Sequence, residues 1–390
     1  MAKTSDVVVV GAGIAGSSLA FHLASHGVGV TLLEKRFPAA GPSGRSSALL
    51  HLFYLDPELS QLAARGIDIL RTMPEITGYP SDYREVGMVW VGGPAAADDY
   101  SAAATRIREK ENGDISLLSL SEFEAIAPGF TTDGIGVVIH EPHSGYADPA
   151  SATTALAKRA GELGAILRMN TRMKRIILEA GRAIGIETEA GERIFADRVV
   201  LAAGPWTRPY LRDIGVDLPL FVERHIIAVL DAPSTARALL PFCWCDDVFM
   251  NYGRPEGEDL LLFGTWAGGG TGTRNSDAPD GDSIGDPDKY KEDGSTEESF
   301  SILRYVTPRI PEMANLGVRR SYAGLYDMSP DDLPVIGPVP GIDNMHVIAG
   351  SSGHGFKLGP AVGEAVAQLI ETGASPLLAP FSPERFLTTR

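Results

Sequence analysis

Cysteine is scarce in this chain, since the 390 residues contain only two, Cys243 and Cys245. Two cysteines cannot build a disulfide framework, and no other thiol is present to complete a cysteine-rich metal site. A CxC pair can still be redox-active or bind metal. We predict instead two reduced thiols on or near a strand, no metal site and a reducing compartment.

Long apolar runs and positive charge are also scarce. No apolar stretch approaches the roughly 20 residues that span a bilayer. The first apolar run leads straight into a glycine motif, so we expect no signal peptide and a cytoplasmic protein. Lys and Arg number 34 against 50 Asp and Glu, and the net charge of -16 argues against nucleic acid or an anionic membrane as partner. An anionic substrate is still compatible, because a pocket can be basic inside an acidic surface.

What the chain does contain is a βαβ unit at its N-terminus. The apolar run DVVVV at 6–10 is typical of a strand buried on both faces. GAGIAG follows at 11–16, a helical pattern stops at Gly27, and a second strand ends at Glu34. The glycines allow a tight turn, close approach of a pyrophosphate and close packing of the helix on the strand. A carboxylate at position 34 can accept hydrogen bonds from both ribose hydroxyls, so the unit predicts dinucleotide binding.

Two further blocks carry nucleotide-domain patterns. The middle block begins with a helix over 149–163 and short strands over 164–169 and 173–178. It continues with a hairpin over 184–189 and 193–195 and a buried strand over 197–203. The last block ends in the strand MHVIAG, a glycine-rich turn and the helix GPAVGEAVAQLI.

The stretches between these blocks carry short alternating strands such as GMVWVGG, HIIAVLDA and DLLLFGT, which favour an antiparallel sheet. We therefore predict an α/β fold (α+β overall) with a discontinuous Rossmann-like nucleotide domain and a second, substrate domain on a mainly antiparallel sheet. The predicted boundaries are 1–85, 149–214 and 323–390 for the first domain, and 86–148 and 215–322 for the second.

The segment 277–298 holds nine acidic and two basic residues and little apolar content. Such a composition predicts an exposed loop. A plain solvated loop is the favoured interpretation, and a lid over the site is the alternative.

Two glycine- and serine-rich turns favour FAD over NAD. GPSGRSS at 41–47 follows soon after the ribose carboxylate, and its Ser and Arg groups could reach pyrophosphate or flavin. GSSGHG at 350–355 precedes the C-terminal helix. An NAD enzyme does not need such a distant C-terminal turn in its nucleotide domain.

Four separated stretches resemble the D-amino acid oxidase/sarcosine oxidase superfamily of flavoproteins. They are the N-terminal βαβ unit, SGRSS at 43–47, DRVVLAAGPW at 197–206 and the stretch 324–370. SGHGFKLGPAVGE is similar to the sarcosine oxidase and N-methyl amino acid oxidase branch, whereas GRSS is closer to the D-amino acid dehydrogenase branch. The resemblance implies FAD in a discontinuous domain, with a substrate sheet roofing the flavin.

The motifs and the resemblance together predict the residues that contact the cofactor. Lys357 is the candidate cation beside the flavin, with a solvated surface lysine as the alternative. His354 could approach the ring or merely pack. The predicted contacts are Gly11, Gly13, Ile14, Ala15, Gly16, Glu34, Lys35, Arg45, Ser46, Ser47, Met173, Ala203, Gly204, Gly324, Gly353, His354, Gly355, Phe356 and Lys357.

The chain departs from this family in ways that bear on the flavin. Monomeric sarcosine oxidases carry a cysteine where Gly324 stands and tether the flavin through it, so we predict non-covalent FAD. Those oxidases also place a lysine over the flavin, in the region of 265–270 here, to speed reaction with oxygen. No lysine occurs between Lys174 and Lys289. This favours a dehydrogenase or slow oxidase that passes electrons to a quinone or another carrier.

A further departure concerns the substrate. Tyr326 stands where amino acid oxidases often carry a carboxylate-binding arginine. Lys357 or Arg224 could replace it, and His51 falls about where the sarcosine branch places another arginine. Tyr252 and Tyr326 fall at positions of aromatic walls, with core packing as the equal alternative. We predict all five as substrate-binding residues, and as catalytic residues His51, Tyr252, Tyr326 and Lys357.

The predicted reaction is oxidation of the C–N bond of a D-amino acid, an N-methyl amino acid or a small amine. Hydride would leave the carbon bonded to the neutral amine for flavin N5, and the imine would then hydrolyse, with no dedicated base required. The alternatives are a 2-hydroxy acid dehydrogenase on the same fold and a flavoprotein subunit of a hetero-oligomeric complex. Assembly into an oligomer is compatible with each.

Overall fold

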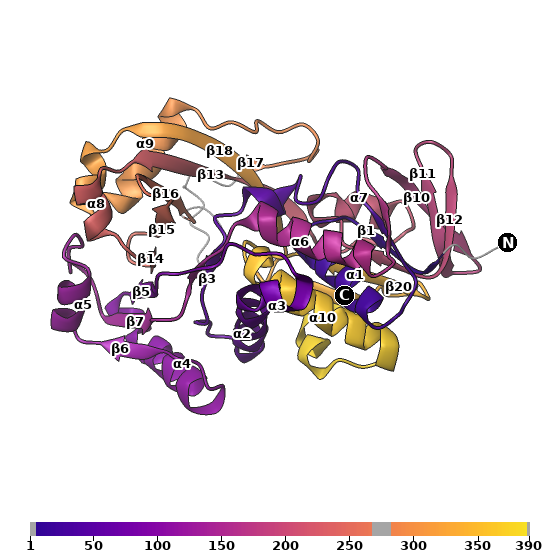
Figure 1. Ribbon diagram of the computed structural model, residues 1–390, viewed down its shortest axis with the longest axis horizontal. Helices are drawn as coiled ribbons and strands as arrows, with labels where there is room; N and C mark the ends of the chain where they lie inside the picture. The colour runs from indigo at the N-terminus through magenta and orange to yellow at the C-terminus, as the bar shows by residue number, and fades with distance from the viewer. Residues whose placement is uncertain (1–4, 267–281, 388–390) are drawn as a thin grey trace.

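The computed structural model describes residues 5–266 and 282–387, which form two large β-sheets at opposite ends of the long axis of the molecule (Figure 1). One sheet has a parallel centre, and the other is mainly antiparallel. The chain crosses between them repeatedly, so neither sheet comes from one continuous stretch of sequence. The predicted combination of a parallel nucleotide sheet with an antiparallel second sheet is therefore confirmed.

The first sheet is built around β1, which lies between β2 and β12 and is parallel to both. The outer strand β9 is parallel to β2, and β20 is parallel to β12. Both faces of β1 are buried, because alternate valines belong to different cores. The strands are β1 (Ser5–Val10), β2 (Val30–Leu33), β9 (Ile166–Arg168), β10 (Met173–Glu179), β11 (Arg182–Thr188), β12 (Arg193–Leu201), β19 (Val335–Pro338) and β20 (Met345–Ala349).

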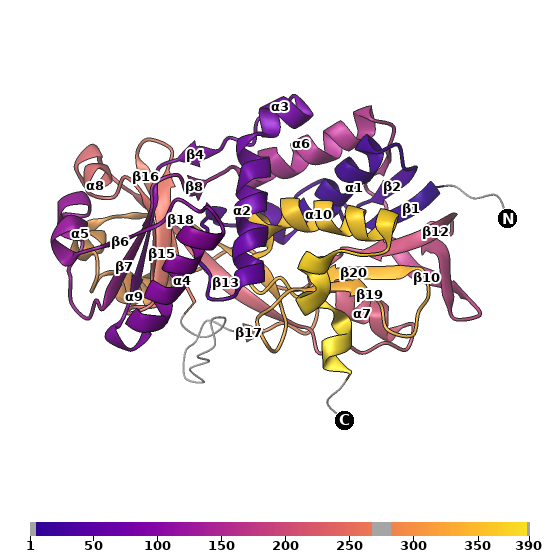
Figure 2. The ribbon, with the colours of Figure 1, turned by 90° about the horizontal axis from the view of Figure 1, so that it is seen from below.

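Helices on one side of this sheet bring the N-terminal and C-terminal blocks together. α1 packs against both α6 and α10, and α10 also packs against α2 (Figure 2). Their apolar faces share one core with Val7 and Val9 of β1. The helices are α1 (Ile14–Ser25), α2 (Pro57–Arg71), α3 (Met73–Thr77), α6 (Pro149–Glu162) and α10 (Gly355–Thr372), with the short α7 (Thr207–Arg212) on the other side.

The second sheet is antiparallel except where β14 runs parallel to β5. Its core contains Phe123, Trp244 and Phe263, all fully buried. The strands are β5 (Met88–Gly92), β6 (Ser116–Leu118), β7 (Val137–Glu141), β13 (Phe221–Asp231), β14 (Cys243–Asp246), β15 (Asn251–Glu256), β16 (Leu260–Thr265), β17 (Asp282–Ser283) and β18 (Val318–Met328). Its helices are α4 (Ala97–Lys110), α5 (Leu120–Ile126), α8 (Ser234–Leu239) and α9 (Thr296–Val306).

The smaller elements join these layers. A short sheet is formed by β3 (Leu49–Leu50), β4 (Arg84–Glu85) and β8 (Gly145–Tyr146). The short 3₁₀ helices are η1 (Pro42–Arg45), η2 (Pro94–Ala96), η3 (Gly204–Trp206), η4 (Pro311–Asn315), η5 (Pro376–Phe381) and η6 (Pro383–Phe386).

Two details differ from the sequence-based expectation. We expected separate strands at 193–195 and 197–203, but β12 runs unbroken because its outer partner changes midway from β11 to β20. We also expected a solvated loop over 277–298. Residues 277–281 lie outside the described residues, and the remainder forms β17, a connection and the first residues of α9.

Both cysteines lie in β14 as buried free thiols, which confirms that prediction. Within residues 5–266 and 282–387, no helix has the length and apolar composition needed to cross a membrane. The same residues contain no cluster of side chains suited to a metal ion.

Candidate cofactor and substrate site

The turn after β1 can be built only with glycine. Gly11 has φ +108°, and a Cβ there would lie 2.3 Å from the carbonyl oxygen of Ala202. A Cβ on Gly16 would lie 2.0 Å from the carbonyl oxygen of Gly11, so the helix could not pack this closely on the strand. Gly13 differs, because its Cβ would meet only the Ser43 hydroxyl, at 3.0 Å. That open side leaves the start of α1 accessible from the cleft above it.

Glu34 follows β2 and lies beside the glycine turn. One carboxylate oxygen accepts the N–H of Ala12 (3.0 Å), and the other accepts the N–H of Arg36 (2.9 Å). These bonds fix the carboxylate at the cleft, where its remaining lone pairs can accept ribose hydroxyls. Beside it, the Lys35 ammonium lies 3.3 Å from the centroid of the Trp206 ring.

A long cleft runs from Glu34, past the start of α1, to the turn before α10. Fourteen of the predicted contacts line it: Gly11, Gly13, Ile14, Ala15, Gly16, Glu34, Lys35, Ser46, Met173, Ala203, Gly204, Gly353, Gly355 and Phe356. Sequence reasoning missed others, including Ser43, Thr171, Arg172, Trp206, Tyr210, Leu325, Asp327, Ile348 and Ser351. Six of them lie inside the stretches that carry the family resemblance, whereas Thr171, Arg172 and Tyr210 lie outside every motif.

The groups in this cleft suit a dinucleotide. The first turn of α1 has no side-chain cap, and its N–H groups have no partner within the helix, so they can donate to a pyrophosphate. The N–H of Ile14 already donates to the Ser43 hydroxyl (3.0 Å), which holds the serine turn against the helix start. At one end of the cleft, the carboxylate of Glu34 can accept hydrogen bonds from a ribose. At its other end, the cleft borders a second cavity.

The second cavity is walled mainly by aromatic rings. Tyr252 stacks on Trp266 with ring centroids 5.5 Å apart, and Trp266 stacks on Trp90 at 6.2 Å. The hydroxyls of Tyr252 and Tyr326 lie 3.4 Å apart. Four residues line both cavities: Ser46, Tyr326, Gly353 and Phe356. The remaining wall is formed by Ser47, Leu49, His51, Cys245, Ser352, His354 and Lys357.

Lys357 brings the cationic group to this second cavity. It lies in the first turn of α10 and is 7% exposed. Its ammonium lies 5.7 Å from the centroid of the Tyr54 ring and has no hydrogen bond or ion pair in the described parts of the chain. Burial lowers its pKa to about 8, although Cys245 and Glu141 act in the opposite direction. The ammonium is therefore mostly protonated at neutral pH and ready to accept a counter-ion.

The two histidines of the cavity are neutral at physiological pH. Burial and the nearby Lys357 lower the pKa of His354 to about 3, and burial also holds the pKa of His51 well below its usual value. The ring of His51 is fixed by a hydrogen bond from Nδ1 to the carbonyl of Phe53 (3.2 Å). Glu141 fixes this segment in turn, since its carboxylate accepts the N–H of Phe53 at 2.9 Å.

Three predicted residues lie elsewhere. The guanidinium of Arg224 is paired with Glu298 at 2.6 Å and lines neither cavity, so the structure offers it no route to a substrate carboxylate. Arg45 donates to the carbonyl of Ala323 (3.1 Å) and pairs with Glu292 instead of lining the cleft. Gly324 lies behind Arg45 and also lines neither cavity.

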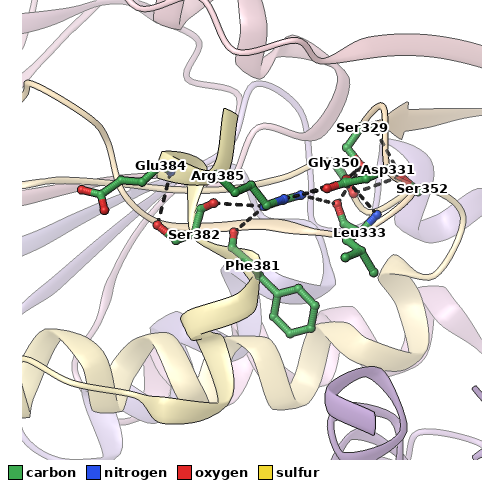
Figure 3. Close-up of polar contacts among 9 residues, drawn as sticks. All are labelled: Ser329, Asp331, Leu333, Gly350, Ser352, Phe381, Ser382, Glu384 and Arg385. Atoms are coloured by element: carbon green, nitrogen blue, oxygen red, sulfur yellow. Dashed lines mark hydrogen bonds and ion pairs between the residues drawn. The ribbon is translucent and has the colours of Figure 1, made fainter. Parts of the chain in front are cut away.

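A polar network from the C-terminal segment supports the turn before α10 (Figure 3). Arg385 donates to both carboxylate oxygens of Asp331, at 2.8 and 3.1 Å. Asp331 accepts the Ser329 hydroxyl (3.0 Å), and the N–H of Ser329 donates to the Ser352 hydroxyl (3.2 Å). Ser352 has φ +47° and lines the aromatic cavity, so the network holds a strained turn at the junction of the two cavities.

A dinucleotide cleft that continues into a small-molecule cavity is the site of a cofactor-dependent oxidoreductase. The chain belongs to the DAO family of FAD-dependent oxidoreductases, whose model matches residues 6–369. The predicted family, the use of FAD and the oxidoreductase class are thereby confirmed.

Curated relatives are similar at about one residue in four. The chain is 26% identical to 4-methylaminobutanoate oxidase (formaldehyde-forming) of Paenarthrobacter nicotinovorans, over 94% of this chain and 43% of that protein. It is also 26% identical to mitochondrial dimethylglycine dehydrogenase of Homo sapiens, over 98% of this chain and 44% of that protein. The chain thus spans less than half the length of these two relatives. Monomeric sarcosine oxidase of a Bacillus species is 26% identical over 96% of this chain and 94% of its own length.

Solved structures show the same fold over nearly the whole chain. L-proline dehydrogenase from P. horikoshii superposes with a TM-score of 0.85 and 26% identity, covering 99% of each chain. Glycine oxidase from Geobacillus kaustophilus superposes with a TM-score of 0.80 at 24% identity, covering 98% of this chain and 99% of that one. Together these likenesses confirm the predicted mixed α/β fold class.

Proposed function

We propose that this protein oxidises the C–N bond of a small amino acid or amine, with a D-amino acid or an N-methyl amino acid as substrate. The observation that carries the proposal is the position of Lys357, a buried and unpaired ammonium in an aromatic cavity that opens onto the cofactor cleft. The names of the relatives support the same chemistry, since they denote enzymes of N-methyl amines and of amino acids.

Lys357 would hold the carboxylate of the substrate. Among the residues that line the described wall of the aromatic cavity, it is the only lysine or arginine. A substrate carboxylate paired with Lys357 would offset the free-energy cost of burying an ammonium without a counter-ion. Tyr252 and Trp266 would flank the rest of the substrate and exclude water from it.

The substrate amine would react as the neutral base. FAD, when bound, supplies the acceptor for the hydride that leaves the substrate carbon. His51 and His354 are uncharged at neutral pH, so they add no positive charge against a substrate amine. Loss of the amine proton before reaction then depends on the pKa of the substrate, and the cavity needs no dedicated base.

FAD would be held without a covalent bond. Gly324 offers no side chain to attach it, and Cys243 does not line either cavity. Cys245 does line the aromatic cavity, yet burial raises the pKa of its thiol well above the usual value, so it is a poor nucleophile. Acid precipitation tests this: flavin in the supernatant supports the proposal, and flavin in the pellet contradicts it.

The electron acceptor would be a quinone or another carrier, with oxygen as a slow alternative. Lys357 is the cavity's lysine, and the sequence offers no second one between Lys174 and Lys289. The region 265–270, where the comparable lysine of sarcosine oxidases was expected to fall, contains none, and its residues 267–270 lie outside the described residues.

An anaerobic screen of the purified holoenzyme tests the reaction. Sarcosine, other N-methyl amino acids, D-amino acids, L-proline and 2-hydroxy acids are added in turn, and loss of the visible flavin absorbance is followed. Bleaching by one amine class is the expected result, and air is then admitted to measure the rate of recovery. Bleaching by hydroxy acids alone would replace the proposal with oxidation of a C–OH bond. No bleaching by any compound would contradict it and favour a chain that works only within a larger complex.

A further inference from the structure

An acidic connection of the second sheet reaches the cofactor cleft of the first. Residues 284–292, called the strap here, lie between β17 and α9 and extend from the second sheet toward the first (Figure 1). One end is fixed where the N–H of Ile284 donates to the carbonyl of Val222 on β13 (2.9 Å). The other is fixed where the carbonyl of Glu292 accepts the N–H of Ala323 on β18 (2.8 Å).

Arg224 also fixes the second end of the strap. Its guanidinium, on a side chain only 8% exposed, donates to the carbonyls of Lys291 (2.8 Å) and Asp293 (3.1 Å). A buried arginine that serves two backbone carbonyls of a surface connection gives that connection a defined position. The segment is therefore a docked part of the molecule and not the freely solvated loop that its composition indicated.

Between the two fixed ends, Asp288 joins the strap to one wall of the cofactor cleft, which is formed by two adjacent segments whose backbones are bonded where the N–H of Thr171 donates to the carbonyl of Glu34 (2.8 Å). One carboxylate oxygen accepts the Lys35 ammonium (2.8 Å), and the other accepts the guanidinium of Arg172 (2.5 Å). Lys35 follows the ribose carboxylate at the end of β2, and Arg172 precedes β10. Both cations line the cleft, whereas Asp288 approaches them from outside it.

The surroundings of Asp288 indicate a formed ion pair. Burial opposes ionisation, yet hydrogen bonds from Lys35 and Arg172 outweigh it and lower the pKa of Asp288 below its usual value. The neighbouring Pro287 is buried, which shows that the strap is packed at this point. On its other side, the Lys35 ammonium rests on the ring of Trp206.

We propose that Asp288 holds the cofactor cleft closed by clamping the strap of the second sheet to Lys35 and Arg172 of the first, and that this contact slows the release of FAD. The inference rests on the proposed non-covalent binding of FAD. The strap is hydrogen-bonded to β18 of the second sheet, and β18 supplies Leu325, Tyr326 and Asp327 to the lining of the same cleft. With both contacts of Asp288 broken, this second-sheet part of the lining would be freer to move away from Lys35 and Arg172. The residue acts through two cleft residues and is a positioning residue for the cofactor.

The direction in which the rate of FAD release changes distinguishes a clamp from a purely electrostatic effect of the Asp288 charge. FAD carries a negatively charged pyrophosphate, so removal of a nearby carboxylate would by itself strengthen binding and slow release. A clamp predicts the opposite, because Asp288→Asn removes the negative charge and leaves one acceptor oxygen where the carboxylate has two, so at least one cation is released and the other is held only by a neutral group. The contacts are also partly exposed, with side chains 24% to 37% accessible, so salt should weaken them.

The experiment measures FAD release from the holoenzyme of the Asp288→Asn variant. The protein is diluted without substrate, and the rise of flavin fluorescence is followed at low salt and in 1 M NaCl. We expect release to be about two- to tenfold faster than in the wild type at low salt, from two partly exposed ion pairs. The difference should shrink in 1 M NaCl.

Asp286→Asn is the matched control. It removes the same charge from the same strap, and Asn keeps an oxygen for the N–H of Asp288 that Asp286 accepts at 3.0 Å. Asp286 pairs with the exposed Lys289 and not with a cleft residue, so its release rate should equal that of the wild type.

Three results would overturn the proposal: unchanged or slower release in Asp288→Asn, equal acceleration in Asp286→Asn, or a covalently attached flavin that needs no clamp. The last would be recognised by acid precipitation and would contradict non-covalent binding as well. An unexpected substrate would contradict the proposed reaction and leave this assay unaffected, because no substrate is present.

Discussion

The hydroxyl of Tyr54 and Nδ1 of His354 lie 3.0 Å apart and join segments separated by 300 residues of sequence. Tyr54 follows the segment that carries His51 into the aromatic cavity, and His354 belongs to the turn before α10. The hydrogen bond therefore connects two sides of the substrate cavity. His354 has a pKa of about 3, so the bond joins two neutral groups at physiological pH.

Replacement of Tyr54 by Phe should loosen the turn without unfolding the protein. A neutral hydrogen bond contributes about 1 kcal/mol, so we expect the free energy of unfolding to fall by that amount. Urea denaturation of the apoprotein measures it. The KM of the substrate should rise more than kcat falls, because the lost bond positions a wall of the cavity. An unchanged KM would show that the turn keeps its place without Tyr54.

Lys357 should give carboxylate binding a characteristic dependence on pH. Because the pKa of Lys357 is about 8, the binding cation is lost as pH rises through that value. The Kd of a simple carboxylate such as propionate, followed by the perturbation of the flavin spectrum, should therefore increase above pH 8. Lys357→Met should weaken binding about 10- to 100-fold at pH 7 and abolish this pH dependence.

Lys357→Arg is the control for charge. Arginine stays protonated throughout the accessible range, so the Kd should not rise between pH 7 and pH 9.5. A rise of the same size in this variant would assign the pH dependence to another group.

Asp327 should make the apoprotein more stable in mild acid. Burial raises the pKa of this cleft-lining carboxyl to about 6, against opposing hydrogen bonds that include the N–H of Ser351. Its folded-state pKa lies above the unfolded value of 3.8, so its contribution is present at low pH and lost as pH rises through 6. Asp327→Asn should therefore exceed the wild type in unfolding free energy by up to about 3 kcal/mol at pH 7.5. The gain should be much smaller at pH 4.5, and equal gains at both pH values would contradict this assignment.

Arg385 should support cofactor binding from a distance. Its loss in Arg385→Met frees Asp331 and, through Ser329, the turn at Ser352 that borders both cavities (Figure 3). We expect the Kd of FAD to rise about fivefold, measured by titration of the apoprotein with flavin fluorescence quenching.

Arg212→Met provides the comparison for Arg385, because Arg212 pairs with an exposed carboxylate, that of Asp217. FAD binding should be unaffected there. An equal loss of affinity in both variants would point to general destabilisation and not to the turn.

Local signals made the cofactor end of the site predictable. Gly11 and Gly16 each answer a separate steric demand of one turn, Gly13 leaves the start of the helix open to a pyrophosphate, and Glu34 directly follows the next strand. These demands are met within about 30 residues, so the sequence alone contains them. Lys357 was identifiable through the resemblance, since it follows the glycine-rich turn directly.

The rest depends on which strands become neighbours. Trp90, Cys245 and Trp266 meet in one cavity wall, although their strands or flanking segments are distant in sequence. Arg224 was predicted to reach the substrate, but its side chain pairs with Glu298. The next residue of β13, His225, stacks instead on Tyr326, which lines both cavities, with ring centroids 4.0 Å apart. Because side chains alternate along a strand, a position known only to within one residue does not identify its face. The pairing of acidic strap residues with cleft cations likewise requires the tertiary structure.

Four residues line both cavities, so the two cavities cannot be changed independently at these positions. Any replacement at Ser46, Tyr326, Gly353 or Phe356 alters the lining of the long cleft together with that of the aromatic cavity. Trp90, Cys245, Tyr252 and Trp266 belong to the second sheet or its edges and touch the substrate side alone. A library of variants made to change substrate specificity should therefore vary these second-sheet positions and keep the four shared residues. Substitutions in the second sheet can then change the aromatic cavity without changing the cleft proposed for FAD.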